Sequence, residues 1–488
     1  MDTKKLRQKI LDLAIRGKLV PQDPNDEPAS VLLERIRAEK EQLIKEGKIK
    51  RSKKSASTDK SHYENVPFEI PESWVWCKLG DLAFYKKGPF GSSLTKSMFV
   101  PKADNTYKVY EQKNAIQKDH SLGSYFISKE KYTSLYSFAV QPYDIIVSCA
   151  GTIGETYVLP SNIEAGVINQ ALMLIRLYCR EIERFYLLYF DYTLKGEAYK
   201  ESKGTAIRNI PPFDILKNFF IPLPPLPEQY RIVKEIERWF ALIDQIEQDK
   251  IDLRTAIKQT KSKILDLAIH GKLVPQDPND EPASELLKRI NPKAEITCDN
   301  GHYENVPFEI PESWVWTTLR DVCKVARGGS PRPIKNYLTT DDDGVNWIKI
   351  GDTDKNGKYI NSTKEKIKQE GIRRSRYVHK GDFLLTNSMS FGRPYILNID
   401  GCIHDGWLVI SPASDTYVTE FLYYLLSSSF AYEQFADAAS GGVVSNLNSN
   451  KVASSYFPLP PLSEQHRIVV KIEEIFERLN QIQESLEA

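Results

Sequence analysis

Apolar residues recur at alternating steps of four and three along the stretch that begins at Ile232. They are Ile232, Ile236, Trp239, Ile243, Ile246, Leu253, Ile257, Ile264 and Leu267, with polar Lys250 and Thr260 interrupting the series. This spacing is typical of a helix that packs lengthwise against another helix. "LPEQ" places a proline where a first helical turn tolerates it, and Gly271 follows the last apolar position. The pattern predicts one helix of about 44 residues, ~65 Å long.

The two ends of the chain together repeat this helix. The C-terminal series is Ile468, Ile472, Ile475, Leu479, Ile482 and Leu486, and the N-terminal residues Leu6, Ile10 and Leu13 match Thr260, Ile264 and Leu267. The simplest geometry is an antiparallel pair with one continuous helix and one helix made from both chain ends. We therefore expect a pseudo-twofold, circular arrangement. Two tandem domains joined by a helix are the alternative, which leaves half a repeat at each end unexplained.

Three blocks recur in the same order along the chain. "ILDLAIRGKLVPQDPNDEPAS" begins at Ile10 and returns at Ile264 with one residue changed, and "HYENVPFEIPESWVW" occurs identically at 62–76 and 302–316. "IPLPPLPEQYRIVKEIE" at 221–237 is echoed by "FPLPPLSEQHRIVVKIE" at 457–473. Near-identical segments predict two equivalent binding surfaces for one kind of partner.

The regions between the blocks, 77–220 and 317–456, match in architecture but not in letters. Each is rich in β-branched and aromatic residues, and each runs a strand pattern into a small polar turn, "YDIIVSCAGTIGE" and "GDFLLTNSMSFGR". We predict a mixed α+β fold with two α/β domains separated by long antiparallel coiled-coil helices. The expected segments are 1–61 (repeat helix and basic linker), 62–220 (first α/β domain), 221–301 (central helix and linker), 302–456 (second α/β domain) and 457–488 (C-terminal repeat helix).

The amino-acid composition is typical of a folded protein and does not indicate a particular ligand. The 488 residues are 41% hydrophobic and 27% charged, with a formal net charge of +1, so nucleic-acid binding would have to rest on local clusters. The Lys/Arg-rich stretch 45–60 is expected to be a solvated tether or, alternatively, a DNA-gripping arm. The six scattered cysteines predict reduced thiols, and the absence of a signal peptide or a long apolar run predicts a cytoplasmic protein.

No catalytic motif stands out. "RNIPPFD" at 208–214 departs from the amino-methyltransferase tetrapeptide because Ile210 stands where that motif has Asn, Asp or Ser before two prolines. No phosphate-binding G-x-x-x-x-G-K-[ST] occurs, and the seven histidines show no metal-ligand spacing. The chain is predicted to be a recognition protein rather than an enzyme, and it is expected to bind no metal of its own.

The order of the blocks, the "PLPPLPEQ" and "PLPPLSEQ" closures and the split helix together resemble the specificity subunit of type I restriction-modification systems, over essentially the full length. The resemblance implies two target-recognition domains, each reading one half of a bipartite, asymmetric DNA target. It also implies that the repeated helices space these domains and dock two methyltransferase subunits, which recruit restriction subunits. S-adenosylmethionine, ATP and Mg²⁺ are then expected on those partners, in a site-specific endonuclease and adenine methyltransferase complex.

Under this resemblance the DNA contacts are expected on polar loops, because base edges and phosphates are read by paired donors, acceptors and cations. The first-domain candidates are Lys86, Lys87, Ser92, Ser93, Lys113, Asn114, Thr152, Arg208 and Asn209. The second-domain candidates are Arg327, Ser330, Arg332, Lys349, Asp352, Arg373, Arg374, Arg376, Asn387, Ser388, Arg393 and Asn446. Turn formation or capping is the alternative for each Ser and Asn, and a solvated face is the alternative for the arginine triplet.

Trp74, Trp76, Trp314 and Trp316 occur in both copies of one block, which favours a shared scaffold or partner contact over a stacking platform for bases. Two other functions stay open at this point. A self-contained DNA-modifying enzyme would transfer methyl groups alone, and a coiled-coil protein adaptor would show no DNA selectivity even with its partners.

Overall fold

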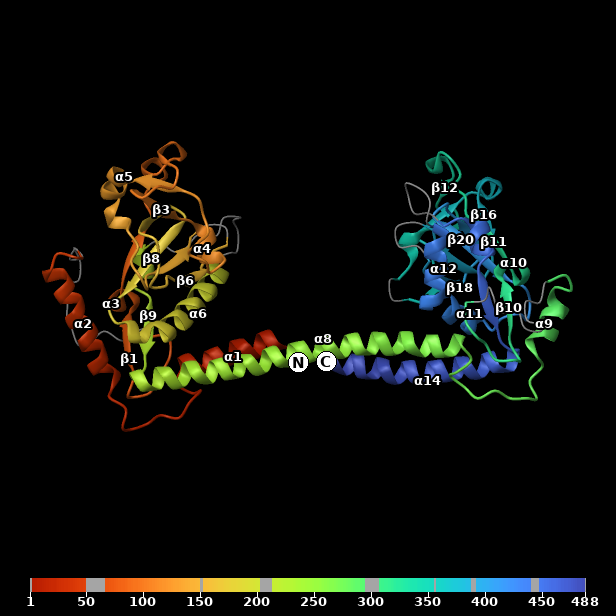
Figure 1. Cartoon of the computed structure of the whole chain (residues 1–488), viewed down its shortest axis with the longest axis horizontal. Helices are drawn as coiled ribbons and strands as arrows, with labels where there is room; N and C mark the ends of the chain where they lie inside the picture. Colours follow the sequence, from red (N-terminus) through yellow and green to blue (C-terminus); the bar gives the residue numbers. More distant parts are fainter. Residues whose placement is uncertain are drawn as a thin grey trace. The chain divides into compact units, whose positions relative to one another are not determined.

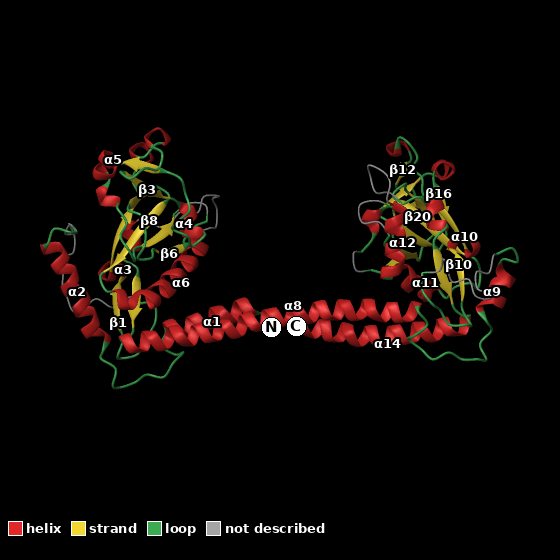
Figure 2. Ribbon diagram, in the orientation of Figure 1, coloured by secondary structure: helices red, strands yellow, loops and turns green. Residues whose placement is uncertain are grey.

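The computed structural model describes residues 2–49, 66–149, 152–201, 213–294, 307–354, 357–387, 392–439 and 447–487. The chain divides into two compact units, Asp2–Gln248 and Asp249–Ala488. Both mix helices with strands (Figure 2), which confirms the predicted mixed α/β class. The segment boundaries expected from the sequence and the pseudo-twofold arrangement of the whole chain stay predictions.

The first unit holds two sheets besides the β1–β9 strand pair, of order β2-β8-β5-β6 and β4-β3-β7 (Figure 1). The strands are β1 Val75–Lys78, β2 Ala83–Lys87, β3 Thr106–Tyr110, β4 Phe126–Ser128, β5 Ile145–Ser148, β6 Thr156–Val158, β7 Gly166–Ile168, β8 Leu172–Leu177 and β9 Phe220–Leu223. The helices are α1 Thr3–Ile15, α2 Ala29–Lys45, α3 Leu79–Leu82, α4 Gln112–Ile116, α5 Lys129–Ser134, α6 Glu183–Glu201 and α7 Phe213–Leu216.

The second unit repeats this plan with extra strands, in sheets of order β11-β20-β17-β18-β14 and β12-β15-β13-β19-β16 and a β10–β21 pair. The strands are β10 Val315–Thr318, β11 Cys323–Arg327, β12 Leu338–Thr339, β13 Val345–Ile348, β14 Tyr359–Ile360, β15 Glu365–Ile367, β16 Arg376–Val378, β17 Phe383–Thr386, β18 Pro394–Leu397, β19 Gly401–Ile403, β20 Trp407–Pro412 and β21 Tyr456–Leu459. The helices are α9 Ala283–Ile290, α10 Leu319–Val322, α11 Thr419–Leu426, α12 Ser429–Ala439, α13 Ser449–Ala453 and α14 Leu462–Glu487.

Equivalent strands pair in the same way in both units. β2 pairs with β8 as β11 pairs with β20, and the parallel pair β3–β7 corresponds to β13–β19. The predicted strand before the polar turn is β5 in the first unit and β17 in the second, each antiparallel to the strand after it. The two variable regions therefore share one fold.

The predicted long helix is α8, Leu226–Ile269, and its 44 residues agree with the length expected from the apolar pattern. Within the first unit α1 runs antiparallel to it, since Arg7 reaches Asp244 at 2.5 Å and Gln22, beyond the end of α1, reaches Glu228. Within the second unit Lys250 Nζ donates to the carbonyl of Leu486 at 2.9 Å. The polar interruption at Lys250 thus has a structural role, because it satisfies a carbonyl in the last turn of α14.

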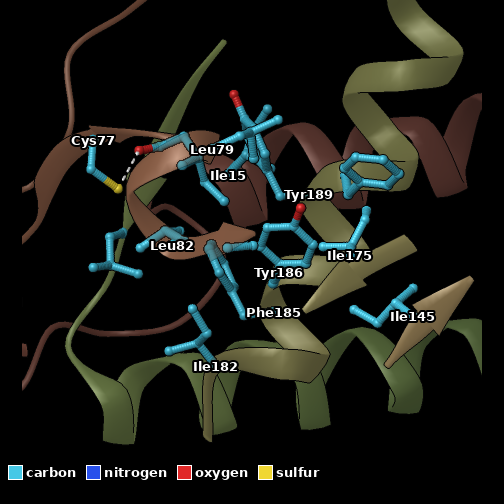
Figure 3. Close-up of a cluster of buried hydrophobic side chains, with 14 of the residues drawn as sticks. Ile15, Cys77, Leu79, Leu82, Ile145, Ile175, Ile182, Phe185, Tyr186 and Tyr189 are labelled. Carbon is cyan, nitrogen blue, oxygen red and sulfur yellow. Dashed lines mark hydrogen bonds between the residues drawn. The ribbon is translucent and has the colours of Figure 1, made fainter. Parts of the chain in front are cut away.

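The core of the first domain lies between α6 and the β2-β8-β5-β6 sheet. Phe185, Tyr186 and Tyr189 of α6 point into the cluster that contains Leu79 and Leu82 (Figure 3). Aromatic side chains on one helical face supply the large apolar area that such a small sheet needs to bury. The loops at the sheet ends are thereby held on a packed scaffold.

Candidate functional site

One turn in each domain ties the ends of several strands together. We call residues 169–172 of the first domain and 404–407 of the second the hub turns, and each links a strand of one sheet to a strand of the other. In the first, the backbone N–H of Asn169 donates to Tyr110 at the end of β3, and Cys149 after β5 donates to Ala171, at 3.0 and 2.9 Å. The N–H of Gly88, after β2, donates to Leu172 at 2.9 Å.

The second hub turn repeats these three bonds. His404 donates to Ile348 at the end of β13, Asn387 after β17 donates to Gly406, and Gly328 after β11 donates to Trp407, at 3.4, 2.9 and 2.9 Å. All six bonds join main-chain atoms, so they do not depend on side-chain identity.

Glycine is required beside both turns. A Cβ added to Gly88 would lie 1.7 Å from the carbonyl oxygen of Asn169, and one added to Gly328 would lie 2.1 Å from that of His404. Both distances are far below van der Waals contact. Gly88 and Gly328 therefore allow the loops that follow β2 and β11, which we call the opening loops, to cross directly over the hub turns.

The hub turns gather three of the predicted recognition loops in each domain. The opening loop, the loop after β3 or β13 and the turn after β5 or β17 all start from residues bonded to the hub. The sequence predicted these loops separately, and the structure brings their first residues to one end of each domain. The fourth predicted loop, with Arg208 and Asn209, lies outside the described residues, as do Ser388 and Asn446.

In the first domain the exposed candidates are Lys87, Ser92 and Thr152, and Ser93 is half-buried. Lys86 is also half-buried, with Nζ 4.6 Å from the centre of the Phe138 ring. Lys113 pairs with Glu111 at 2.9 Å, which offsets its charge. Among the candidate cations of this domain that the structure describes, Lys87 is thus the one most open to a phosphate.

Asn114 requires a correction. It is 0% exposed, its Oδ1 accepts the N–H of Glu111 at 2.7 Å, and its Nδ2 donates to the carbonyls of Asp119 and Leu122. With its hydrogen bonds satisfied inside the protein, it caps the start of α4 and is not available to DNA. Asp352 occupies the equivalent place, where Oδ2 accepts the N–H of Lys349 at 2.8 Å. The capping alternative therefore holds for Asn114, and Asp352 makes the same kind of hydrogen bond.

The prediction for Asn387 also requires a correction, because the residue is only 1% exposed and its backbone N–H donates to the hub turn. Lys349 is half-buried and pairs with Glu365 at 2.7 Å. Arg393 is half-buried, with its guanidinium 5.2 Å from the centre of the Tyr395 ring.

Arginines of the second domain gather around Asp405 in the hub turn. Arg332 Nη2 donates to Asp405 Oδ2 at 3.1 Å, Ser330 Oγ donates to Oδ1 at 2.8 Å, and Arg327 Nε donates to the Asp405 carbonyl at 3.3 Å. Arg376 Nε in turn donates to the carbonyl of Arg327 at 3.3 Å. The Asp405 carboxylate thus pairs with Arg332, main-chain carbonyls hold Arg327 and Arg376, and the local charge stays positive.

The remaining arginines extend this surface. Arg373 and Arg374 are exposed, and the Arg374 guanidinium lies 5.6 Å from the centre of the Tyr337 ring. The hydrogen bond from Ser330 and the nearby Arg332 lower the pKa of Asp405, so this carboxylate is charged at neutral pH. An exposed cluster of guanidinium groups suits phosphates and guanine edges.

Sequence reasoning missed Asp405 and its counterpart in the first domain, Gln170. Gln170 is exposed and follows Asn169, whose Oδ1 accepts the N–H of Ala171 at 3.0 Å. The signal was present as "INQAL" and "IHDGW", a polar pair between two apolar strands. It was overlooked because those strands are short and close together.

The repeated blocks meet in a separate, fully matched cluster that we call the repeat core. In the first unit Trp74 Nε1 donates to Glu228 Oε2 at 2.9 Å, and Gln22 Nε2 donates to Glu228 Oε1 at 2.6 Å. Arg231 pairs with Asp26 at 2.6 Å. All three repeated blocks contribute one or more of these residues.

The second unit has the same repeat core with shifted numbers. Trp314 donates to Glu464 at 2.8 Å, Gln276 donates to Glu464 at 2.6 Å, and Arg467 pairs with Asp280 at 2.7 Å. The tryptophans of this block are all buried, which favours the shared-scaffold interpretation and excludes a stacking platform for bases. The repeats agree here because each set builds the same interior in its own unit.

Across the described ranges, the cysteines Cys77, Cys149, Cys179, Cys323 and Cys402 are free thiols. In the same ranges no cluster of three or more His, Cys, Asp or Glu side chains could hold a metal ion. None of the described helices is long and apolar enough to cross a membrane.

Residues 71–254 and 311–488 each match the type I restriction modification DNA specificity domain, and the chain belongs to that family. Its role is that of a DNA sequence-specificity subunit, which is a recognition component rather than a catalyst. It is 28% identical to the type I restriction enzyme EcoAI specificity subunit of Escherichia coli, over 98% of this chain and 90% of that one. The EcoEI specificity subunit of the same organism is 27% identical, over 99% and 91%.

Two solved structures share the fold. The HsdS subunit from Thermoanaerobacter tengcongensis aligns with a TM-score of 0.52 at 18% identity, over 86% of this chain and 93% of that chain. A chain from a structure describing complex assembly and conformational transition of the type I R-M system aligns with a TM-score of 0.53 at 19% identity, over 86% and 94%.

Proposed function

We propose that each variable domain reads one half of a bipartite, asymmetric DNA target through the loops around its hub turn. The observation that supports this proposal is the contrast between the backbone of the hub turns and the side chains around them. The hub turns are held by equivalent main-chain bonds in both domains, while the exposed side chains around them differ. Two readers built on one scaffold suit two dissimilar half-sites.

A domain exchange tests this division. Residues 79–219, between β1 and β9, are replaced by the corresponding region of a related subunit, which leaves the strand pair and the repeat core intact. Sequencing of methylated motifs in cells should show one half-site changed and the other kept. A change in both halves would contradict independent readers.

Two methyltransferase subunits dock, in this proposal, on the repeated surfaces beside the repeat cores. The exposed loops 21–25 and 275–279 have the same sequence in both copies. Identical exposed segments on matched interiors suit two copies of one partner. Restriction subunits then join through the methyltransferases, and S-adenosylmethionine, ATP and Mg²⁺ belong to these partners in a cytoplasmic complex.

Stoichiometry tests the docking proposal. Pro24→Arg and Pro278→Arg each place a charged side chain on one exposed loop. Native mass spectrometry should find two methyltransferase subunits on the unchanged chain, one on either single variant and none on the double variant. A single variant that still holds two subunits would place the docking surface elsewhere. Methyl transfer by the isolated chain would instead favour a self-contained enzyme.

The long helix is proposed to set the length of the unread spacer between half-sites. Four residues inserted between Gln248 and Asp249 add about one turn, roughly 6 Å of helix, while the Arg7 and Lys250 contacts stay within their own units. Base pairs rise about 3.4 Å each, so the preferred spacer should lengthen by about one or two base pairs. An active insertion variant with an unchanged spacer would show that α8 is not the ruler.

A further inference from the structure

The hub turns present one accessible side chain at equivalent positions: Gln170 is exposed, and the side chain of Asp405 is 46% exposed. The neighbouring backbone bonds agree between the two turns, so the two Cα atoms are fixed in the same way relative to their strands. A side chain mounted on a backbone fixed at three strand ends is pre-organised, because little backbone freedom remains to be lost on binding. The difference in chemistry at this position is therefore available for discrimination.

We infer that this position determines one base pair in each half-site, with Gln170 reading an adenine and Asp405 positioning Arg332 to read a guanine. A glutamine amide offers a donor and an acceptor that match N6 and N7 of adenine in the major groove. A guanidinium offers two donors that match O6 and N7 of guanine. The inference rests on the proposed division of the target between the domains.

Asp405 is a positioning residue in this scheme. It accepts from Ser330 and Arg332 and thereby holds the opening loop against the hub turn. The Arg332 side chain is 78% exposed, and it has five N–H donors, one of which bonds to Asp405. Its planar fork therefore has donors left for a base edge while the carboxylate fixes its orientation.

The alternative is that Asp405 only stabilises the loop. The two roles predict different results, because lost stability weakens binding to every sequence, whereas lost positioning weakens discrimination at one base pair. Removing a negative charge from a cationic surface should also raise affinity for unrelated DNA. Sequence discrimination is therefore the informative measurement, and total affinity is not.

The test uses the full complex with its methyltransferase subunits and five variants, one of which, Gln170→Arg, tests a change of preferred base pair. Gln170→Ala, Asp405→Asn and Arg332→Lys are compared with Glu433→Gln, which removes one negative charge from an exposed position on α12 of the second domain. Methylated motifs are sequenced in cells, and binding is measured by competition with duplexes carrying single base-pair substitutions. Thermal melting verifies that each variant is folded.

Gln170→Ala should lose about tenfold or more discrimination at one A·T pair of the first half-site and leave the second unchanged. Asp405→Asn and Arg332→Lys should do the same at one G·C pair of the second half-site only. Glu433→Gln should change neither. Gln170→Arg should shift the preferred pair from A·T to G·C, which keeps the inference testable even if truncation is tolerated.

Unchanged discrimination in all the folded Gln170, Asp405 and Arg332 variants would overturn the inference. So would a uniform loss of binding to every sequence. The 79–219 exchange is run in the same assay. If it alters one half-site while these variants alter none, the inference fails and the division of the target stands. If it alters both half-sites, the proposed division itself fails.

Discussion

The repeat cores of the two units differ far less than their hub turns do. The Trp–Glu hydrogen bond measures 2.9 Å in one and 2.8 Å in the other, and the Arg–Asp pair measures 2.6 and 2.7 Å. At the hub turns the bonds again match, but the accessible side chain is the exposed amide of Gln170 in one domain and the partly exposed carboxylate of Asp405 in the other. Sequence identity is thus retained where side chains carry the structure and relaxed where the backbone carries it.

The largest effect is expected when the tryptophans of the repeat cores are removed. Trp74→Ala and Trp314→Ala each delete a buried ring and the donor to a buried carboxylate, so each should cost about 3–5 kcal/mol of unfolding free energy. Chemical denaturation should show the loss in the unit that carries the change.

Phenylalanine at the same positions is the control, since it keeps a ring but loses the N–H, and it should cost less. Costs for Trp74→Ala and Trp314→Ala that differ several-fold would show that the matched geometry hides unequal energetics.

A smaller effect is expected at the turns that follow α1 and α8. Gly17 and Gly271 have φ of +65° and +66°, and an added Cβ would lie 2.5 Å from Pro71 Cγ and 2.4 Å from Pro311 Cγ. Alanine should cost about 1–2 kcal/mol for the left-handed backbone, and the proline contact adds to that. The two variants should lose similar stability in thermal melts.

Gly47→Ala separates the two causes. Gly47 has φ of +69° with no atom within 4 Å of an added Cβ, so alanine there meets only the backbone cost. If Gly47→Ala proved as damaging as Gly17→Ala, the contact with Pro71 would contribute nothing.

The smallest expected effect is a shared pH dependence. Burial raises the pKa of Glu228 and of Glu464, against the opposing hydrogen bonds from Trp and Gln. The folded state therefore binds protons more tightly than the unfolded chain. The unfolding free energy falls as pH rises from the unfolded pKa through the folded pKa, and it is level above that window.

Glu228→Gln and Glu464→Gln should each remove this slope from their own unit. The slope is measured from denaturant midpoints across acidic pH, as the difference between the unchanged chain and each variant. The difference isolates Glu228 or Glu464, because the other carboxylates titrate in both chains. Parallel profiles would show that these carboxylates keep an ordinary pKa.

The sequence predicted the framework well and the contacts poorly. The length of α8 follows from its apolar period, because a lengthwise helix pair demands that spacing. Asn114 was predicted to contact DNA, but it caps α4. A polar residue after a strand can do either, and the burial of its side chain distinguishes the two roles. Gln170 and Asp405 matter because their turns are hydrogen-bonded to strands that are distant in the sequence. No local sequence pattern reveals such contacts.

The main-chain construction of the hub turn has a consequence for how such proteins diversify. Because the bonds beside Gln170 join peptide groups, most substitutions at Gln170 leave the scaffold intact. Mutations that alter target choice are therefore separated from mutations that threaten folding. A library randomised at Gln170 alone should yield mostly folded chains, and new specificities could be selected from it without compensating changes elsewhere.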